Sequence, residues 1–523
     1  MALEFVTTDQ TTTYDIDSGD EVFVTAGTEF RVSDGFDFAD FGTMEVYFAG
    51  DMYLGDDLAD DFFNATGNTD IFFTFAATST SLIAGDAFVM TGNASVVSEL
   101  DVANQGNVTV GEAFLFTSSF DRVGFNNSGT LTGMSTNSQA LVASLGAQTD
   151  FSFTNSGTVE TLGNTNIITA TALDAAIINH GTITAGSGTA INLAGGGSSI
   201  FTFQNTGQIS GLIILGGASD FANSGELFGE LTLSNFGDEF HNSGDIFGDV
   251  LTRGGEDTVT NTGTINGDVD TGSGIDLVQN SGTINGNVDL GSFNNTLVNT
   301  GEILGNVSAG SADDDVVNSG HILGNLNLGA GTNTYTAVAG GVVSGSISGS
   351  NGFDTLFGGA NSDRFDGQGG NDVLDGKAGN DTLDGGAQND ILRGGEGLDR
   401  LIGGSGDDQF IFDVEIDTDV IEDFGNGADQ IDLSVFVENI DFVQLYLANT
   451  GPKGGNALLG SGGNLGHSGS NTVTITATQV SDNTVLTLTA TGGALAEADP
   501  NLSITITLEN VIADTLNIDD FVF

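Results

Sequence analysis

Residues 280–298 read NSGTINGNVDLGSFNNTLV, and residues 299–317 read NTGEILGNVSAGSADDDVV. The two segments are identical at 9 of 19 positions, so the chain contains a 19-residue repeat. Each copy starts with the triplet Asn-Ser/Thr-Gly, and the interval between successive triplets is constant over the last five steps and one residue shorter in the first. The regular triplets begin at Asn205, Asn223, Asn242, Asn261, Asn280, Asn299 and Asn318, with looser copies at Asn127, Asn155 and Asn179.

Apolar residues keep fixed places within each copy, alternating with polar ones and separated by glycine and asparagine. This pattern is typical of short strands joined by tight turns. A fixed period of roughly 20 residues indicates a solenoid, in which stacked coils bury one shared core. The expected core columns are Ile246, Ile265, Ile284, Ile303, Ile322; Val250, Val269, Val288, Val307, Leu326; and Phe240, Val259, Val278, Leu297, Val316.

The polar positions of the repeat predict how successive coils are held. Stacked asparagines should form an amide ladder, each side chain bonding the next. Glycine and asparagine are expected at corners with left-handed backbone angles. The second half of a copy, such as TGSGIDLVQ at 271–279, approaches the nonapeptide G-G-x-G-x-D-x-U-x, where U is a large apolar residue. One 19-residue copy is close to two nonapeptides, so we expect two strands per coil.

From residue 349 the nonapeptide becomes explicit, and seven copies follow without a gap: GSNGFDTLF, GGANSDRFD, GQGGNDVLD, GKAGNDTLD, GGAQNDILR, GGEGLDRLI and GGSGDDQFI. This stretch resembles the RTX (repeats-in-toxin) family, whose glycine- and aspartate-rich nonapeptides form a calcium-binding β-roll. The residue types suit that ion, because calcium takes six to eight hard oxygen ligands. Backbone carbonyls of a glycine turn and the sixth-position carboxylate supply such oxygens.

The resemblance implies calcium ions between the turns of every second nonapeptide, on two edges of the roll. Asn361 and Gln388 replace the fourth-position glycine, so the Asp363 and Asp390 turns depart from the pattern. The implied ligands on one edge are Asp354, Asp372, Asp390 and Asp408, on the other Asp363, Asp381 and Asp399, with fourth-position glycines Gly370, Gly379, Gly397 and Gly406.

Two further acidic features are weaker candidates for cation sites. The 19-residue copies carry a matching column, but their glycines are incomplete, so a solvated edge is favoured there over calcium. At 55–61, GDDLADD is either a cation loop or, as we favour, a solvated turn. The matching column is Asp238, Asp257, Asp276, Asn295, Asp314 and Asn333.

The C-terminal part begins with DQFIFDVEIDTDVIEDFGNGADQIDLS at 408–434 and ends in LENVIADTLNIDDFVF. The first segment resembles the C-terminal β-roll region of serralysin-like secreted proteins, and the last resembles the uncleaved signal of type I secretion. Strands are expected at TVTITAT and TVLTLTA. The first residues lack a basic and then apolar region, so no cleaved N-terminal signal is expected, and no stretch is apolar enough to span a bilayer.

The fold prediction is therefore an all-β chain in four parts. We expect irregular β coils and an N-terminal cap at 1–126, and a right-handed parallel β-solenoid of 19-residue coils at 127–348. The RTX calcium β-roll should occupy 349–412. A C-terminal β domain with the secretion signal should occupy 413–523.

Charge and side-chain inventory narrow the function. The chain of 523 residues has 71 acidic and 8 basic residues, a net charge of -63, which disfavours nucleic acid as a partner. It has no cysteine, hence neither disulfides nor thiolate sites. No H-E-x-x-H zinc motif occurs, and His180, His241, His321 and His467 are scattered. The nearest group of catalytic residue types, His241 with Arg253 and Asp238, is at chance level, so no enzyme is expected.

The sequence favours a secreted calcium-binding structural protein that assembles with itself at the bacterial cell surface, as a surface layer, extracellular matrix fibre or biofilm component. One alternative is an RTX adhesin that binds a surface or a glycan such as cell-surface polysaccharide. A β-helix polysaccharide lyase or epimerase is a third interpretation, because such enzymes also combine solenoids with RTX repeats.

Overall fold

The structure is a computed structural model of the chain. It describes residues 3–6, 21–24, 29–32, 36–39, 43–48, 51–54, 63–67, 70–76, 80–83, 88–92, 99–110, 115–117, 121–134, 142–144, 150–162, 166–196, 198–413, 418–434, 442–448, 456–459, 472–491, 503–511, 516 and 518–522. The chain divides into a first unit, Met1–Asp276 with Gly282–Gly286, and a second unit, Leu277–Ser281 with Asn287–Phe523. The described part contains no helix long and apolar enough to cross a membrane.

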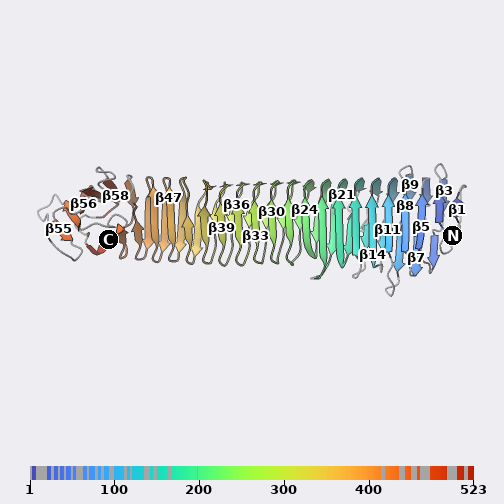
Figure 1. The fold of residues 1–523 in the computed structure, drawn as a ribbon, viewed down its shortest axis with the longest axis horizontal. Helices are drawn as coiled ribbons and strands as arrows, with labels where there is room; N and C mark the ends of the chain where they lie inside the picture. Colours follow the sequence, from blue (N-terminus) through green and yellow to red (C-terminus); the bar gives the residue numbers. More distant parts are fainter. Residues whose placement is uncertain are drawn as a thin grey trace. The chain divides into compact units, whose positions relative to one another are not determined.

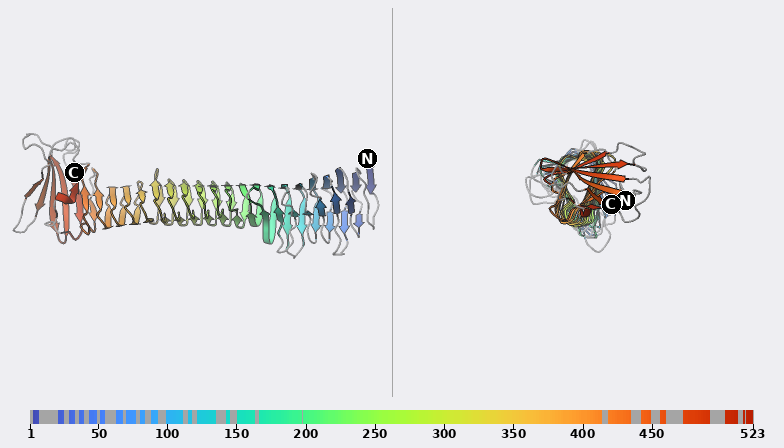
Figure 2. Two further views of the ribbon diagram at one scale, coloured as in Figure 1. Left: turned by 90° about the horizontal axis from the view of Figure 1, so that it is seen from below. Right: turned by 90° about the vertical axis from the view of Figure 1, so that its left-hand side faces the viewer.

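Each unit is built from coils whose strands pair in parallel with the equivalent strands of the next coil (Figure 1). In the first unit, β27 (Glu239–Asn242) pairs with β30 (Thr258–Asn261), placing Phe240 beside Val259. The strands of a unit form two rows that face each other (Figure 2). The predicted parallel β-solenoid is therefore confirmed.

The first row of the first unit contains one strand from each coil. Its other strands are β1 (Leu3–Val6), β2 (Glu21–Val24), β5 (Thr43–Phe48), β8 (Asp70–Phe75), β11 (Glu99–Asn104), β14 (Arg122–Asn127), β17 (Asp150–Asn155), β20 (Asp174–Asn179), β22 (Ile200–Asn205) and β24 (Ala218–Asn223). The described strands before residue 127 thus pair in the same parallel order as the later ones.

The second row of the first unit contains the remaining strands of these coils. They are β3 (Glu29–Val32), β4 (Phe36–Ala39), β6 (Asp51–Leu54), β7 (Phe63–Gly67), β9 (Thr80–Ile83), β10 (Phe88–Gly92), β12 (Asn107–Val110), β13 (Leu115–Thr117), β15 (Thr130–Gly133), β16 (Val142–Ser144), β18 (Thr158–Thr161), β19 (Ile168–Thr171), β21 (Thr182–Ala194), β23 (Gln208–Leu215), β25 (Glu226–Phe228), β26 (Leu231–Thr232), β28 (Asp245–Ile246), β29 (Val250–Leu251), β31 (Thr264–Ile265), β32 (Val269–Asp270) and β34 (Thr283–Ile284).

The second unit continues the two-row pattern. Its first row holds β33 (Leu277–Asn280), β36 (Thr296–Asn299), β39 (Asp315–Asn318), β42 (Thr334–Ala337), β45 (Thr355–Phe357), β47 (Val373–Ala378), β49 (Ile391–Glu396), β51 (Gln409–Ile411), β53 (Gln430–Asp432) and β59 (Phe521–Val522). Its second row holds β35 (Val288–Asp289), β37 (Glu302–Ile303), β38 (Val307–Ser308), β40 (His321–Ile322), β41 (Leu326–Asn327), β43 (Val342–Val343), β44 (Ile347–Asn351), β46 (Arg364–Gly369), β48 (Thr382–Ala387), β50 (Arg400–Ser405) and β52 (Thr418–Ile421).

The C-terminal strands add antiparallel pairing to the second unit. β56 (Thr472–Val480) and β57 (Asn483–Thr491), both expected from the sequence, form an antiparallel pair, and β58 (Ser503–Leu508) pairs with β57 in the same way. β58 also pairs in parallel with β52. The remaining elements are β54 (Phe442–Ala448), β55 (Asn456–Leu459) and a 3₁₀ turn, Ile518–Asp520.

The three predicted apolar columns form the core of the 19-residue coils, and every member is at most 1% exposed. The strand count differs from the expectation, because a 19-residue coil contributes three short strands, such as β27, β28 and β29, and not two. Two strands per coil occur in the nonapeptide roll, for example β47 with β48, and in the first unit where two second-row strands are merged, as in β22 with β23. The extra corner comes from the segment around Gly248, which separates the Ile and Val columns.

The predicted asparagine ladder is present in both units. In the first unit, Nδ2 of Asn223 donates to Oδ1 of Asn242 at 2.8 Å, and Asn242 bonds Asn261 in the same way. In the second unit, Asn280 bonds Asn299 and Asn299 bonds Asn318, each at 2.9 Å. The ladder also includes Asn104, which the sequence analysis missed because it opens an Asn-Gln-Gly triplet. These amides are buried, and their bonds satisfy polar groups that water cannot reach.

The triplet glycines allow the backbones of successive coils to approach closely. They do not form left-handed turns. None of the triplet residues has a positive φ, whereas glycines at other corners of the 19-residue coils do, such as Gly255, Gly274 and Gly310, so the expectation holds for those glycines and fails for the triplet. A Cβ on Gly263 would lie 2.2 Å from the carbonyl oxygen of Gly244 in the preceding coil. A side chain at this position would therefore push two backbones apart.

This contact gives a test of the stacking. Gly263→Ala should lower the free energy of unfolding by about 1–3 kcal/mol, the usual cost of overpacking. Gly196→Ala is the matched control, since a Cβ there would meet nothing within 4 Å. Urea unfolding of both variants in calcium buffer would measure the difference, and equal stability would contradict the proposed role of Gly263.

Candidate metal centre

Each nonapeptide turn has two residues in the left-handed region, at its second and fourth positions. Before Asp372, for example, Gln368 has φ 69° and Gly370 has φ 152°. The pattern persists with Gln388 (φ 80°) in the fourth position, so the Asp390 turn keeps the common backbone despite its missing glycine. The turn before Asp363 differs, because neither Gly359 nor Asn361 has a positive φ.

The sixth-position aspartates form a buried ladder along both edges of the roll. All seven predicted aspartates are at most 3% exposed. In five of them, Oδ1 accepts the backbone N–H of the aspartate one coil earlier. The bonds are Asp354 to Asp372 (2.8 Å), Asp372 to Asp390 (2.7 Å), Asp390 to Asp408 (2.9 Å), Asp363 to Asp381 (2.7 Å) and Asp381 to Asp399 (2.8 Å), naming the N–H donor first.

The second carboxylate oxygen of these side chains is buried beside other oxygens. Among the described residues, nothing donates a hydrogen bond to Oδ2 of Asp354, Asp372, Asp381, Asp390 or Asp408. A Cβ on Gly367 would lie 2.5 Å from Oδ2 of Asp372 and 2.6 Å from the carbonyl oxygen of Gly385. The first-position glycine therefore leaves room for two oxygens of different coils.

This donor set fits calcium, which binds carboxylate and carbonyl oxygens. Asp372, Asp381, Asp390 and Asp408, with the carbonyls of their turns, are the residues that would hold the ion. A buried carboxylate oxygen with no donor costs free energy that a cation would recover.

The electrostatics of the ladder support the same conclusion. Burial, together with repulsion from neighbouring aspartates, raises the pKa of Asp372, Asp381 and Asp390 from 3.8 to about 7. Burial likewise raises the pKa of Asp408 to about 6. The folded roll therefore resists ionisation of these groups unless positive charge is supplied.

The ladder extends past the predicted ligands to Asp419 and Asp429. Their Oδ1 atoms accept the N–H groups of Asp399 at 3.0 Å and Asp408 at 3.1 Å. Sequence analysis missed both, although the quoted segment 408–434 contains them. The interval between successive aspartates of the ladder, its rungs, becomes longer there and no longer follows the nonapeptide period. Oδ2 of Asp429 accepts the N–H of Gly425 at 2.7 Å, so protein groups satisfy this last rung.

Asp363 also differs from the common arrangement. Its Oδ2 accepts the N–H of Gly359 at 3.0 Å, a bond that the altered turn makes possible. The predicted departure at Asn361 therefore has a structural counterpart, whereas the one at Gln388 does not.

The aspartate column of the 19-residue coils is buried, so the favoured interpretation of a solvated edge was wrong. Asp238, Asp257, Asp276, Asn295, Asp314 and Asn333 are at most 2% exposed. In the second unit this column and one edge of the roll form a single ladder, because Oδ1 of Asp354 accepts the N–H of Asn333 at 2.9 Å.

The other candidates do not form a site with the predicted members. Asp238 is buried and accepts hydrogen bonds from Ser234 and Ser219, while His241 lies on the surface near Glu239, 4.0 Å from it. Ligand atoms of Asp220, Glu239 and His241 lie within 4.8 Å of one another, and all three residues are exposed. The acidic segment 55–61 and His467 lie outside the described residues.

Fold and turns together define a parallel β-solenoid protein with a calcium-type β-roll. Residues 344–374 and 375–410 match the family model of the RTX calcium-binding nonapeptide repeat (4 copies), so the chain carries RTX calcium-binding repeats. Among solved structures, one match is the AlgE6R3 subunit of the mannuronan C5-epimerase from Azotobacter vinelandii. It is 30% identical, covering 34% of this chain and 80% of that chain, but its TM-score is 0.12 and it carries no argument here. No match was found among curated proteins.

The raised pKa values predict how pH and calcium act on the fold. A carboxyl with pKa 3.8 unfolded and about 7 folded binds more protons when folded, so calcium-free stability should fall as pH rises through this window. Calcium needs the ionised form, so its affinity should rise with pH over the same range. Thermal unfolding between about pH 5.5 and 8, with and without calcium, would measure both trends; calcium-free stability that rises with pH would contradict them.

Individual ligands can be tested by charge-removing substitutions. Asp372→Asn and Asp381→Asn should each raise the calcium concentration at the folding midpoint by at least about tenfold, since even outer-shell changes cost about 10–100-fold in metal affinity. Asp363→Asn should do less, because its turn lacks the left-handed pair of residues that the other turns share. The control is Glu396→Gln, which removes an exposed charge from a neighbouring turn. Circular dichroism during calcium titration would rank the variants, and a Glu396 effect equal to that of Asp372 would indicate general charge relief.

Proposed function

We propose that this protein is a secreted structural protein that assembles with copies of itself at the bacterial cell surface, as a surface layer or matrix fibre, when calcium is bound. RTX repeat proteins are typically secreted. The observation that carries the proposal is an outward-facing column of side chains, five residues after the triplet asparagine, which is apolar at Phe228, Phe247, Leu304 and Leu323 and polar at Asn266 and Asn285.

The column presents large apolar groups to solvent in both units. Phe228 and Phe247 in the first unit are 37% and 49% exposed, and their rings stack 4.5 Å apart. Leu304 and Leu323 in the second unit are 41% and 52% exposed at the same repeat position. Exposed apolar groups gathered in this way usually mark an interaction surface. A second copy of the chain has the same rung spacing, so it can match the column rung by rung.

Calcium supplies the condition for assembly. At a charge of -63, copies of the chain repel one another, and monovalent salt screens that repulsion only partly. Calcium ions bound in the roll neutralise the negative charge of its aspartates. Ions shared between carboxylates of two copies would add direct bridges.

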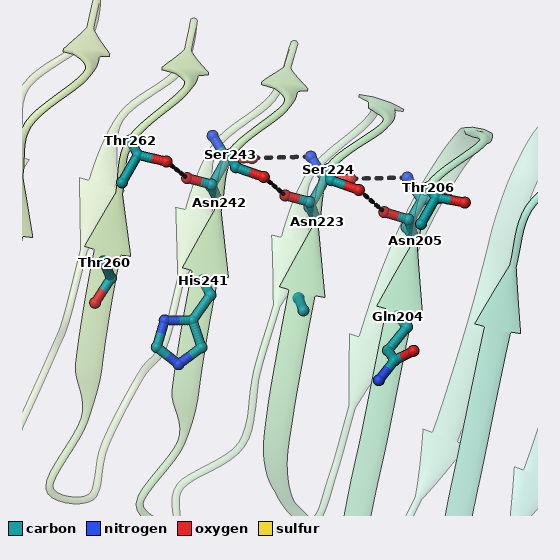
Figure 3. Close-up of a pocket in the computed structure, with 11 residues that line it drawn as sticks. Gln204, Asn205, Thr206, Asn223, Ser224, His241, Asn242, Ser243, Thr260 and Thr262 are labelled. Carbon is teal, nitrogen blue, oxygen red and sulfur yellow. Dashed lines mark hydrogen bonds between the residues drawn. The ribbon is translucent and has the colours of Figure 1, made fainter.

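An adhesin is the second candidate, and a surface pocket of the first unit favours it. The pocket has a volume of about 330 Å³ and is lined by hydroxyl, amide and imidazole groups, including Gln204, His241 and Thr260 (Figure 3). The hydroxyls of Ser243 and Thr262 also bond the preceding coil, which fixes them in place. Polar groups set among exposed carbon atoms suit a glycan. A lyase or epimerase ranks lower, because the acidic cluster beside His241 is fully exposed.

Assembly is directly testable. Purified protein should form ordered sheets or fibres in millimolar calcium and should return to single chains in EDTA. Sodium chloride of equal ionic strength should not replace calcium. Phe247→Ser should weaken assembly, while Phe353→Ser, which removes an exposed ring outside the column, should not. Light scattering and electron microscopy would follow the reaction. Protein that stays monodisperse in calcium and binds glycans would favour the adhesin.

A further inference from the structure

The aspartate ladder does not stop where the nonapeptides begin. Within the second unit, Asn333 Oδ1 accepts the N–H of Asp314 at 3.0 Å, and Asp314 Oδ1 accepts that of Asn295 at 2.7 Å. Within the first unit, Asp257 Oδ1 accepts the N–H of Asp238 at 2.8 Å. These are the bonds made in the roll, repeated here at the interval of the longer coils.

The turns of the 19-residue coils also have the backbone of the nonapeptide turns. Arg253 (φ 73°) and Gly255 (φ 125°) precede Asp257, as Gln368 and Gly370 precede Asp372. Gly310 (φ 99°) and Ala312 (φ 89°) precede Asp314. Carbonyl direction is preserved as well, because a Cβ on Gly272 would lie 1.9 Å from the carbonyl oxygen of Arg253 one coil earlier. In the roll, a Cβ on Gly404 would likewise lie 1.9 Å from the carbonyl oxygen of Gly386.

The asparagine rungs of this column show what the turn needs. Nδ2 of Asn295 donates to the carbonyl oxygen of Phe293 at 2.9 Å, and Nδ2 of Asn333 donates to that of Gly329 at 3.0 Å. Both amides therefore neutralise a turn carbonyl with the N–H₂ group, and the oxygen of Asn333 also accepts an N–H from the preceding coil. These rungs are complete without an ion.

An aspartate in the same place has an oxygen where asparagine has the donor. Oδ2 of Asp257 and Oδ2 of Asp314 are buried, and no described residue donates a hydrogen bond to either. Asp238 differs, because the N–H and Oγ–H of Ser234 donate to its Oδ2 at 3.0 and 3.1 Å. Asp257 and Asp314 thus each have one buried carboxylate oxygen without a donor. In the equivalent asparagine rungs, the N–H₂ group at this place bonds a turn carbonyl.

We propose that the Asp257 and Asp314 turns each bind a divalent cation of the calcium type, with ligands from the carboxylate and the turn carbonyls. The nonapeptide motif does not identify these turns, because Thr252 and Ala309 occupy the place of its first glycine. The hydroxyl of Thr252 donates to the carbonyl oxygen of Thr271 at 3.2 Å and also lies near the carboxylate of Asp257. The site is defined by the left-handed pair and the buried carboxylate. It does not depend on self-assembly.

Calcium binding to the full-length chain tests the proposal, measured by equilibrium dialysis at concentrations where the protein is a single chain. The double variant Asp257→Asn/Asp314→Asn should bind fewer calcium ions per chain than the natural sequence. It should fold, because asparagine already occupies equivalent rungs. The control Asp245→Asn/Glu302→Gln removes the same charge from exposed positions and should bind as many ions as the natural chain.

A gain of binding gives a second measurement. Asn295→Asp should add bound calcium, because it replaces the internal N–H donor by an oxygen. Unchanged stoichiometry in the double variant, with stability that responds to pH and not to calcium, would show that a proton occupies Oδ2 and would overturn the proposal. If the double variant failed to fold, the gain variant would decide. Failure of assembly alone would leave these binding results intact.

Discussion

The separation of two hydrogen-bonded parallel strands, about 4.8 Å, is the constraint on which this structure depends. Because each coil advances by one such step, every side chain faces its own equivalent in the next coil. Phe240 meets Val259, and Asn242 meets Asn261. Stacking of identical side chains is favourable for apolar groups, which share a core. It is also favourable for amides, which both donate and accept hydrogen bonds. It is unfavourable for carboxylates, which only accept and which repel one another.

The aspartate ladder follows from that asymmetry. One oxygen of each carboxylate is satisfied by the N–H of the neighbouring coil, as Asp372 shows with Asp354. The other cannot be satisfied by the next aspartate, so a donor or a cation must come from elsewhere. At Ser234 and Gly425 the chain supplies N–H groups of its own. In the roll, the first-position glycines leave space for oxygens alone, and the fold becomes coupled to calcium.

The sequence predicted those features that repeat with one residue type at one interval. Ile246 and its equivalents, the asparagine ladder and the nonapeptide aspartates are all of this kind. It did not predict three strands per 19-residue coil. The corner at Gly248 depends on the close approach of its backbone to that of Gly229 in the preceding coil, and secondary-structure propensities do not describe such contacts. Asp419 and Asp429 escaped because their spacing changes. The burial of Asp257 was missed because its turn lacks the first glycine of the nonapeptide motif. The burial follows instead from stacking on the coil of Asp238, whose N–H bonds the Asp257 carboxylate.

Asparagine forms permanent rungs and aspartate conditional ones, in two different ladders. In the triplet ladder, each amide of a run such as Asn104 to Asn242 donates to the amide of the next coil, so this run needs no ion. An aspartate rung with a buried free oxygen closes only when a cation or proton is present. Since the first unit is rich in asparagine rungs and the roll has aspartate at every turn, we expect calcium dependence to be graded along the chain. We expect folding of the roll to respond to extracellular-type calcium levels, about 10⁻⁴–10⁻³ M, and the asparagine-bonded coils to form a core without the ion.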